Sequence, residues 1–300
     1  MSTNKYKPLS PSPCYTYATM ETRPTIAIMY DFDKTLTTRD MQEYTFIPKL
    51  GLSSSAFWQK ANDLARKQGM DSILAYMKLM LDESKKQAKP IRRNDFVALG
   101  QELEFFPGVL GWFSFVNELG AKRNLCIEHY IISSGLKEII EGSAIGSEFR
   151  RIYACEYFYD ENGVAVWPKL SVNYTAKTQF LFRINKGVLD VYEDQALNAF
   201  TAESERSVPF RNMIYIGDGL TDVPCMKLVK QNGGKSIAVH AKGKEEISRR
   251  LMAEGRINFY TEADYTPGSE LSFLVETSLD EMCSQNILQA YQRRMRGEGQ

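Results

Sequence analysis

Two aspartates that follow an apolar segment carry the strongest chemical signal in the sequence. Asp31 and Asp33 come directly after TIAIMY, with one residue between them. Side chains two positions apart at a strand end point the same way, so the two carboxylates would repel each other. A cation beside them would relieve that repulsion. The alternative interpretation is an acidic turn in which Thr35 is a local cap.

A second motif, Ser133-Ser134-Gly135, follows the apolar segment CIEHYII. A strand that runs into a hydroxyl and a glycine, with a helix after it, is typical of an anion site. The hydroxyl and the backbone N–H groups at the helix start would both donate hydrogen bonds to the anion. An ordinary helix N-cap is the alternative interpretation.

Lys177 lies early in the predicted helix TAKTQFLFRIN. A lysine near a helix N-terminus works against the helix dipole, so a nearby anion would explain its position. An exposed surface lysine is the alternative, and Lys169 and Lys186 compete for the same role.

A second pair of aspartates follows the apolar segment NMIYI, in the motif Gly217-Asp218-Gly219-Leu220-Thr221-Asp222. The glycines allow a sharp turn at the end of the strand. Asp218 would then lie at the strand tip and Asp222 in the next turn, where both can face one cation. Oxygen ligands without histidine or cysteine favour Mg²⁺.

These motifs require a sheet whose strands end side by side. Short Ile- and Val-rich runs typical of buried parallel strands alternate with helical patterns. The sequence therefore predicts an α/β fold, a Rossmann-like parallel sheet flanked by helices, with its ligands beyond the carboxyl ends of the strands. The predicted strands lie at 25–33, 126–135, 212–219, 235–241 and 256–261, and the helices at 107–119, 136–147, 177–186, 221–231, 243–254 and 269–294.

Two segments interrupt this alternation. Residues 41–105 read as a helical cap, with Ser54, Asp71 and Asn94 at helix starts and Gly69 at a helix end. Residues 155–167 read as a β-hairpin around Asp160-Glu161-Asn162-Gly163. The predicted domains are a polar N-terminal arm at 1–24, an α/β core at 25–40 and 106–300, and the cap at 41–105.

Composition narrows the function classes. The 300 residues include 37 basic and 37 acidic side chains, so the absence of a basic excess argues against nucleic-acid binding. Five cysteines without a CxxC pair argue against a disulfide framework or a zinc site, and favour a reducing, cytoplasmic location. No apolar run approaches the roughly 18 residues of a membrane span, and the N-terminus has no signal-like apolar region.

The four motifs resemble, in type and order, those of the haloacid dehalogenase superfamily of phosphohydrolases. The resemblance extends over about residues 25–241, and DFDKTLT together with GDGLTD are its specific elements. The helical insert, and FFPGV at 105–109, are similar to the phosphoserine phosphatase-like branch with its C1-type helical cap.

The resemblance implies a phosphatase that acts on a small phosphorylated metabolite. Asp31 would be the nucleophile that forms an aspartyl-phosphate, and Asp33 the general acid and base. The resemblance implies that Mg²⁺ is bound by Asp31, the Asp33 carbonyl, Asp218 and Asp222. It implies that Ser133 and Lys177 stabilise the phosphoryl group. Further substrate contacts are expected from Thr35, Asp40, Ser134 and Gly135.

The sequence departs from this branch in the cap. Asp40 stands where phosphoserine phosphatases have a glutamate, and Met77 stands near the position of their cap arginine. Without that arginine, phosphoserine is expected to be a poor substrate. The alternative is that Arg66 or Lys78 fills the role from another turn. A phosphotransferase or mutase, and an inactive binding protein on the same fold, are the alternative functions.

Overall fold

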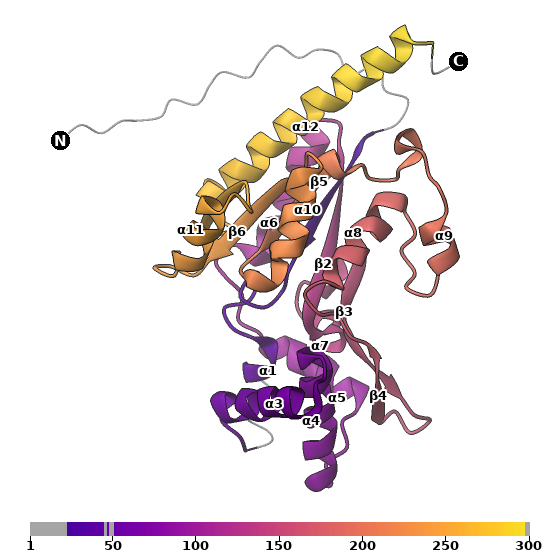
Figure 1. Ribbon diagram of the computed structural model, residues 1–300. Helices are drawn as coiled ribbons and strands as arrows, with labels where there is room; N and C mark the ends of the chain where they lie inside the picture. The colour runs from indigo at the N-terminus through magenta and orange to yellow at the C-terminus, as the bar shows by residue number, and fades with distance from the viewer. Residues whose placement is uncertain (1–22, 45–46, 48–50, 298–300) are drawn as a thin grey trace, which may run out of the picture.

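A computed structural model describes residues 23–44, 47 and 51–297. Its centre is a seven-stranded sheet of order β4-β3-β2-β1-β5-β6-β7 (Figure 1). All neighbouring strands are parallel except β3 and β4, which are antiparallel. The strands are β1 (Thr25–Tyr30), β2 (Cys126–Leu136), β3 (Arg151–Tyr159), β4 (Ala165–Leu170), β5 (Met213–Gly217), β6 (Lys235–His240) and β7 (Phe259–Glu262).

Strand β1 forms the middle of the sheet because it is apolar on both faces. Its residues after Thr25 are all buried, as expected for a strand covered by helices on both sides. It pairs in parallel with β2 on one side and with β5 on the other. The carboxyl ends of these three strands therefore meet at one edge of the sheet, which is where the three predicted motifs begin.

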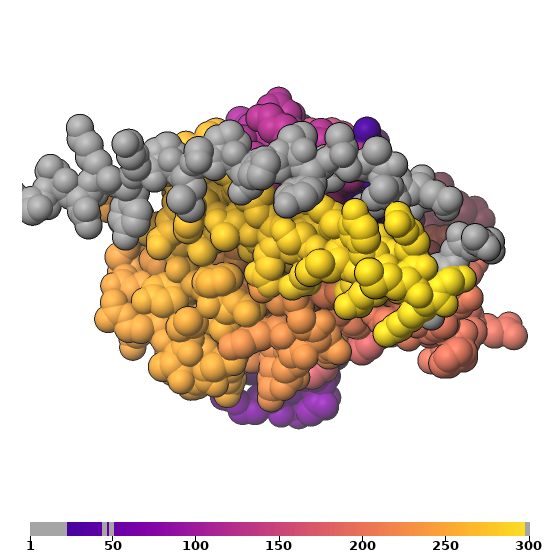
Figure 2. All heavy atoms as spheres, turned by 90° about the horizontal axis from the view of Figure 1, so that it is seen from above, coloured from indigo at the N-terminus to yellow at the C-terminus, as the bar shows by residue number. Residues whose placement is uncertain are grey.

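Helices cover both faces of the sheet and confirm the predicted Rossmann-like α/β fold (Figure 1). On one face α6 (Val109–Lys122) packs against α12 (Glu270–Met295), where Arg123 forms ion pairs with Glu276 and Asp280. On the other face α8 (Lys177–Lys186) packs against α10 (Val223–Gln231). Seen from above, the yellow α12 lies beside the orange part of the chain (Figure 2).

A separate group of helices lies near the carboxyl ends of the strands, at the bottom of Figure 1. It contains α1 (Met41–Tyr44), α3 (Ser54–Gln68), α4 (Ser72–Lys86), α5 (Arg93–Leu99) and the 3₁₀ turn η1 (Gly100–Glu102). Ser53 caps α3 by accepting from the Ala56 amide, and Asp71 caps α4 by accepting from the Ile73 and Leu74 amides. The third predicted helix, α5, begins at Arg93, one residue before the expected Asn94.

The predicted hairpin is longer than 155–167 and is part of the central sheet. β3 first pairs with β2 in parallel and then continues into the antiparallel pair with β4. The hairpin also contacts the helical group. The Tyr157 hydroxyl donates to the Met77 carbonyl at 2.8 Å, and the Ala165 amide donates to the Ile91 carbonyl at 2.9 Å.

The remaining elements are short. The helix expected at 136–147 is interrupted, with α7 at Lys137–Glu141 and η2 at Gly146–Glu148. The other elements are α9 (Asp194–Asn198), η3 (Glu203–Glu205), η4 (Phe210–Asn212), η5 (Leu220–Asp222) and α11 (Glu246–Ala253). Most of the predicted arm at 1–24 lies outside the described residues. Among the residues that are described, no helix has the length and apolar character needed to cross a membrane.

Candidate active site

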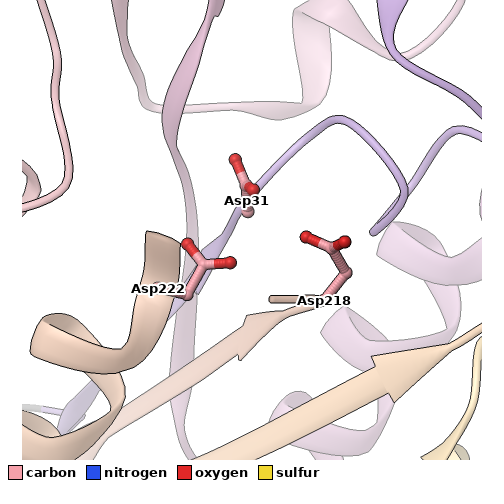
Figure 3. A group of neighbouring side chains, drawn as sticks. All are labelled: Asp31, Asp218 and Asp222. Atoms are coloured by element: carbon pink, nitrogen blue, oxygen red, sulfur yellow. The ribbon is translucent and has the colours of Figure 1, made fainter. Parts of the chain in front are cut away.

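Three carboxylates meet where β1 and β5 end (Figure 3). Asp31 follows β1, Asp218 follows β5, and Asp222 ends the turn η5 that leads into α10. One oxygen from each carboxylate lies within 4.8 Å of the others. Because β1 and β5 are adjacent parallel strands, their ends bring Asp31 and Asp218 together despite a sequence separation of almost 190 residues.

Lys177 joins two of these carboxylates from the start of α8. Its Nζ lies 3.0 Å from Asp31 Oδ1 and 2.7 Å from Asp222 Oδ1, and its side chain is completely buried. The Tyr215 hydroxyl also donates to Asp222 Oδ1, at 2.8 Å. Asp222 packs so closely on Gly217 that a Cβ there would lie 2.6 Å from Asp222 Oδ2, so this position needs glycine.

The charges in this group are not balanced by the lysine alone. Burial raises the pKa of Asp31 to about 7, with repulsion from Asp222 adding to the shift and Lys177 opposing it. Burial, then repulsion from Asp222 and Asp31, raises the pKa of Asp218 well above its usual range. Burial lowers the pKa of Lys177, but attraction from Asp222 and Asp31 outweighs it and the net pKa is raised. Three oxygen ligands and an excess of negative charge fit a hard divalent cation.

Asp33 lies outside the three-carboxylate group and has different neighbours. Its Oδ1 accepts a hydrogen bond from the Met41 amide at 2.7 Å. Burial, followed by repulsion from Asp40 and Asp31, raises its pKa well above the ordinary value. A carboxyl group with a raised pKa holds its proton near neutral pH, which suits it to donate that proton.

The Ser133 segment reaches the site from β2. Ser133 is fully buried, and its Oγ accepts from the Gly135 amide at 3.0 Å. A Cβ on Gly135 would collide with Met41 and lie 2.9 Å from Asp33 Oδ2, so the glycine allows the close approach to Asp33. The segment was expected at a helix start, but β2 continues through Leu136 and α7 begins only afterwards.

The other predicted substrate contacts differ in exposure. Thr35 is fully buried, and its Oγ1 has no hydrogen-bond partner within the part of the chain that the structure describes. The Ser134 Oγ also has no hydrogen-bond partner among the described residues. Asp40 is partly exposed and forms an ion pair with Lys34, with Nζ 2.5 Å from Oδ2.

Several residues around the site were missed from the sequence. Tyr76 of α4 donates its hydroxyl to the Ser134 carbonyl at 2.8 Å. Asn173, just before α8, donates to Asp71 at 2.9 Å, and its own Oδ1 accepts from the Ala176 amide. Asp71 was recognised only as a helix start. These contacts connect α4 to the segments that carry Ser133 and Lys177, and no local pattern marks them.

Comparison with known proteins identifies the family of the chain. The family model for haloacid dehalogenase-like hydrolases matches residues 28–227. An uncharacterized protein of Borreliella burgdorferi is 29% identical over 273 residues, covering 82% of this chain and 93% of its own.

Solved structures show the same fold. A probable phosphoserine phosphatase from Vibrio cholerae in its unliganded form has a TM-score of 0.56 and 14% identity, over 88% of this chain and 67% of its own. A phospho-aspartyl intermediate analogue of phosphoserine phosphatase has a TM-score of 0.52 and 14% identity, over 85% and 99%.

Proposed function

Because the chain belongs to the haloacid dehalogenase-like hydrolases, we propose that it is a Mg²⁺-dependent phosphatase of a small phosphorylated metabolite. The observation that carries the proposal is the meeting of Asp31, Asp218 and Asp222 around the buried Lys177. Asp31 is the proposed nucleophile, and the reaction passes through an aspartyl-phosphate.

Asp31 and Asp218 would hold the metal ion with the Asp33 backbone carbonyl, and Asp222 would support them. When bound, Mg²⁺ supplies positive charge that offsets the carboxylates and the phosphoryl oxygens. Lys177 holds Asp31 and Asp222 in place through its two ion pairs. The nucleophile is therefore oriented before substrate arrives, which lowers the entropic cost of the reaction.

The first chemical step forms one bond and breaks another. A carboxylate oxygen of Asp31 attacks phosphorus, and the bond from phosphorus to the ester oxygen breaks. Asp33 gives its proton to the departing oxygen, so the product leaves as an alcohol. The raised pKa of Asp33 supports this role because it favours the protonated form of the carboxyl group before the step.

The second step restores the enzyme. Asp33, now ionised, takes a proton from a water molecule as the water oxygen attacks phosphorus. The bond between phosphorus and the Asp31 oxygen breaks, inorganic phosphate leaves, and both aspartates return to their starting forms. Ser133 and Lys177 would stabilise negative charge on the phosphoryl oxygens in both steps.

Residues 41–105 are proposed to act as the cap over this site. Their helices lie near the strand ends, and α4 contacts the Ser133 and Lys177 segments through Tyr76 and Asp71. A cap placed there excludes water during ester cleavage and selects the leaving group. The core would perform chemistry common to all phosphomonoesters.

Phosphate release tests the proposal directly. The purified full chain is incubated with Mg²⁺ and p-nitrophenyl phosphate, and with a panel of small phosphomonoesters in the absence of any acceptor other than water. We expect stoichiometric phosphate from at least one ester. Asp31→Asn should abolish turnover while the circular dichroism spectrum and the Tm stay close to wild type.

Substantial turnover by Asp31→Asn would refute the nucleophile. Phosphate release only when a second alcohol is added would favour a phosphotransferase, and no release from any ester would favour a binding protein.

A further inference from the structure

Lys34 has a backbone conformation that its residue type does not favour. Its φ is 56°, in the left-handed region, which is unfavourable for a residue with a side chain relative to glycine. The other two non-glycine residues with positive φ in the described chain are Ala88 and Asn124, which follow the ends of α4 and α6 where this conformation is common. Lys34 instead lies in the turn after β1, beside Asp33. The strain falls at a functional position and calls for a role of the side chain.

The ammonium group of Lys34 is an accessible cation beside the acidic site. Half of its side-chain surface is exposed, and its ion-pair partner Asp40 is 25% exposed. Asp218 and Asp33 are close enough to interact electrostatically with it. Lys177, by comparison, is buried and already paired with two carboxylates of the cluster.

The ion pair of Lys34 and Asp40 lies next to the proposed general acid. Asp33, the proposed proton donor to the leaving oxygen, directly precedes Lys34, and its carboxylate is held by the Met41 amide next to Asp40. Ion pairs this exposed are weak in water, so an incoming anion can replace Asp40 at small cost. An incoming ammonium group would have to displace Lys34 from Asp40 and then lie beside another cation.

We propose that Lys34 binds a second anionic group on the leaving-group side of the substrate, exchanging Asp40 for that group. The inference rests on the proposed phosphatase function and narrows its substrates to phosphomonoesters that carry a further carboxylate or phosphate. Lys34 thereby selects the leaving group, and Asp40 keeps the lysine in place when the site is empty.

Binding to a set of two-carbon phosphomonoesters tests this selection. The set is ethyl phosphate, phosphoglycolate, ethylene glycol bisphosphate and phosphoethanolamine, measured by calorimetry with Mg²⁺ in the Asp31→Asn background so that no turnover occurs. Phosphoglycolate and ethylene glycol bisphosphate carry a second anionic group. We expect at least one of these two esters to bind tenfold or more tightly than ethyl phosphate, equal to about 1.4 kcal/mol. Phosphoethanolamine should bind no more tightly than ethyl phosphate. The two anionic esters distinguish a carboxylate from a second phosphate.

Two substitutions of Lys34 separate its charge from its backbone. Lys34→Asn tolerates the left-handed conformation but removes the charge, and should reduce the anionic preference to less than threefold. Lys34→Arg keeps the charge and should keep the preference. Asp40→Asn frees the lysine and should strengthen binding of the anionic ester. Thermal unfolding of each variant shows whether the fold is retained, and Lys34→Asn should be at least as stable as its parent.

Equal affinities for ethyl phosphate and for the two esters with a second anionic group, or a preference for that second group that survives Lys34→Asn, would overturn the inference. So would a complete lack of binding to all four esters. Hydrolysis assays with the wild-type protein, which keeps Asp31, separate the two proposals. If the esters bind with the expected preference but are not cleaved, the phosphatase proposal fails alone; if they are cleaved without charge preference, only the role of Lys34 fails.

Discussion

His129 should make the protein lose stability in mild acid. The imidazole lies in β2 with only 3% of its surface exposed. Its Nδ1 is 3.1 Å from the Tyr30 hydroxyl and its Nε2 is 3.1 Å from Asn117 Oδ1. Trp112 donates to the Tyr30 oxygen at 3.0 Å, which leaves the Tyr30 proton to point at Nδ1. This chain of hydrogen bonds suits a neutral ring with its proton on Nε2, and leaves no acceptor for a second proton.

The magnitude follows from the pKa values of the two states. Burial lowers the pKa of His129 to about 3 in the folded protein, whereas an unfolded histidine has a pKa near ~6.5. Between these values the unfolded state binds a proton that the folded state does not, so stability falls as the pH falls below ~6.5. At pH 5 the loss from this one group is about 2 kcal/mol, and it disappears above pH ~7.

Urea unfolding followed by circular dichroism at pH 7.5, 6.5, 5.5 and 5.0 measures this loss. His129→Gln keeps a donor and an acceptor of similar reach but cannot titrate, so its stability should fall by about 2 kcal/mol less than wild type over this range. His240→Gln, at the chain's other histidine, is the matched control and should follow wild type. If His129→Gln loses as much stability as wild type between pH 7.5 and 5.0, the buried neutral imidazole is not the cause and the reasoning is wrong.

Three further results are expected at the candidate site. Exhaustive EDTA treatment should abolish phosphate release, Mg²⁺ should restore it and Ca²⁺ should not, since Ca²⁺ takes more ligands at longer distances; full activity after EDTA would contradict a metal site. Gly217→Ala should displace the Asp222 carboxylate and weaken Mg²⁺ binding tenfold or more in calorimetry, and unchanged affinity would show that the close contact is unimportant. Tyr76→Phe removes the bond to the Ser134 carbonyl, so it should cost about 1 kcal/mol of stability and lower kcat. The exposed Tyr192→Phe serves as its control, and equal kcat in both variants would argue against a positioning role for Tyr76.

The parts of the molecule that could be predicted are those in which one segment determines its own structure. The apolar runs at Thr25–Tyr30 and Met213–Gly217 indicate buried parallel strands, and parallel strands end at one edge. The aspartates that follow them could therefore be expected to meet there. The helix starts were predicted at Ser54 and Asp71 for the same reason, because a capping side chain acts on its own neighbours. Asp71 is the observed cap of α4, whereas the cap of α3 is Ser53, one residue before the predicted position.

The parts that could not be predicted depend on contacts between distant segments. The sequence of β3 shows a hairpin but not that its first half pairs with β2, because one strand pattern fits either partner. The hydrogen bond from Tyr76 to Ser134 spans 58 positions and leaves no periodic trace. The left-handed conformation of Lys34 is equally invisible, since lysine is not a residue that signals it.

The path of β3 also determines how the helical group can move. A cap joined to its core only by two linkers can swing in any direction, whereas this one also rests on a strand that is continuous with the central sheet (Figure 1). A paired strand bends far less easily than a loop, so the hairpin acts as a fixed pivot along one side. We expect the helices that the hairpin contacts to stay fixed to the sheet on this side, where the Tyr157 hydroxyl and the Ala165 amide donate to the Met77 and Ile91 carbonyls.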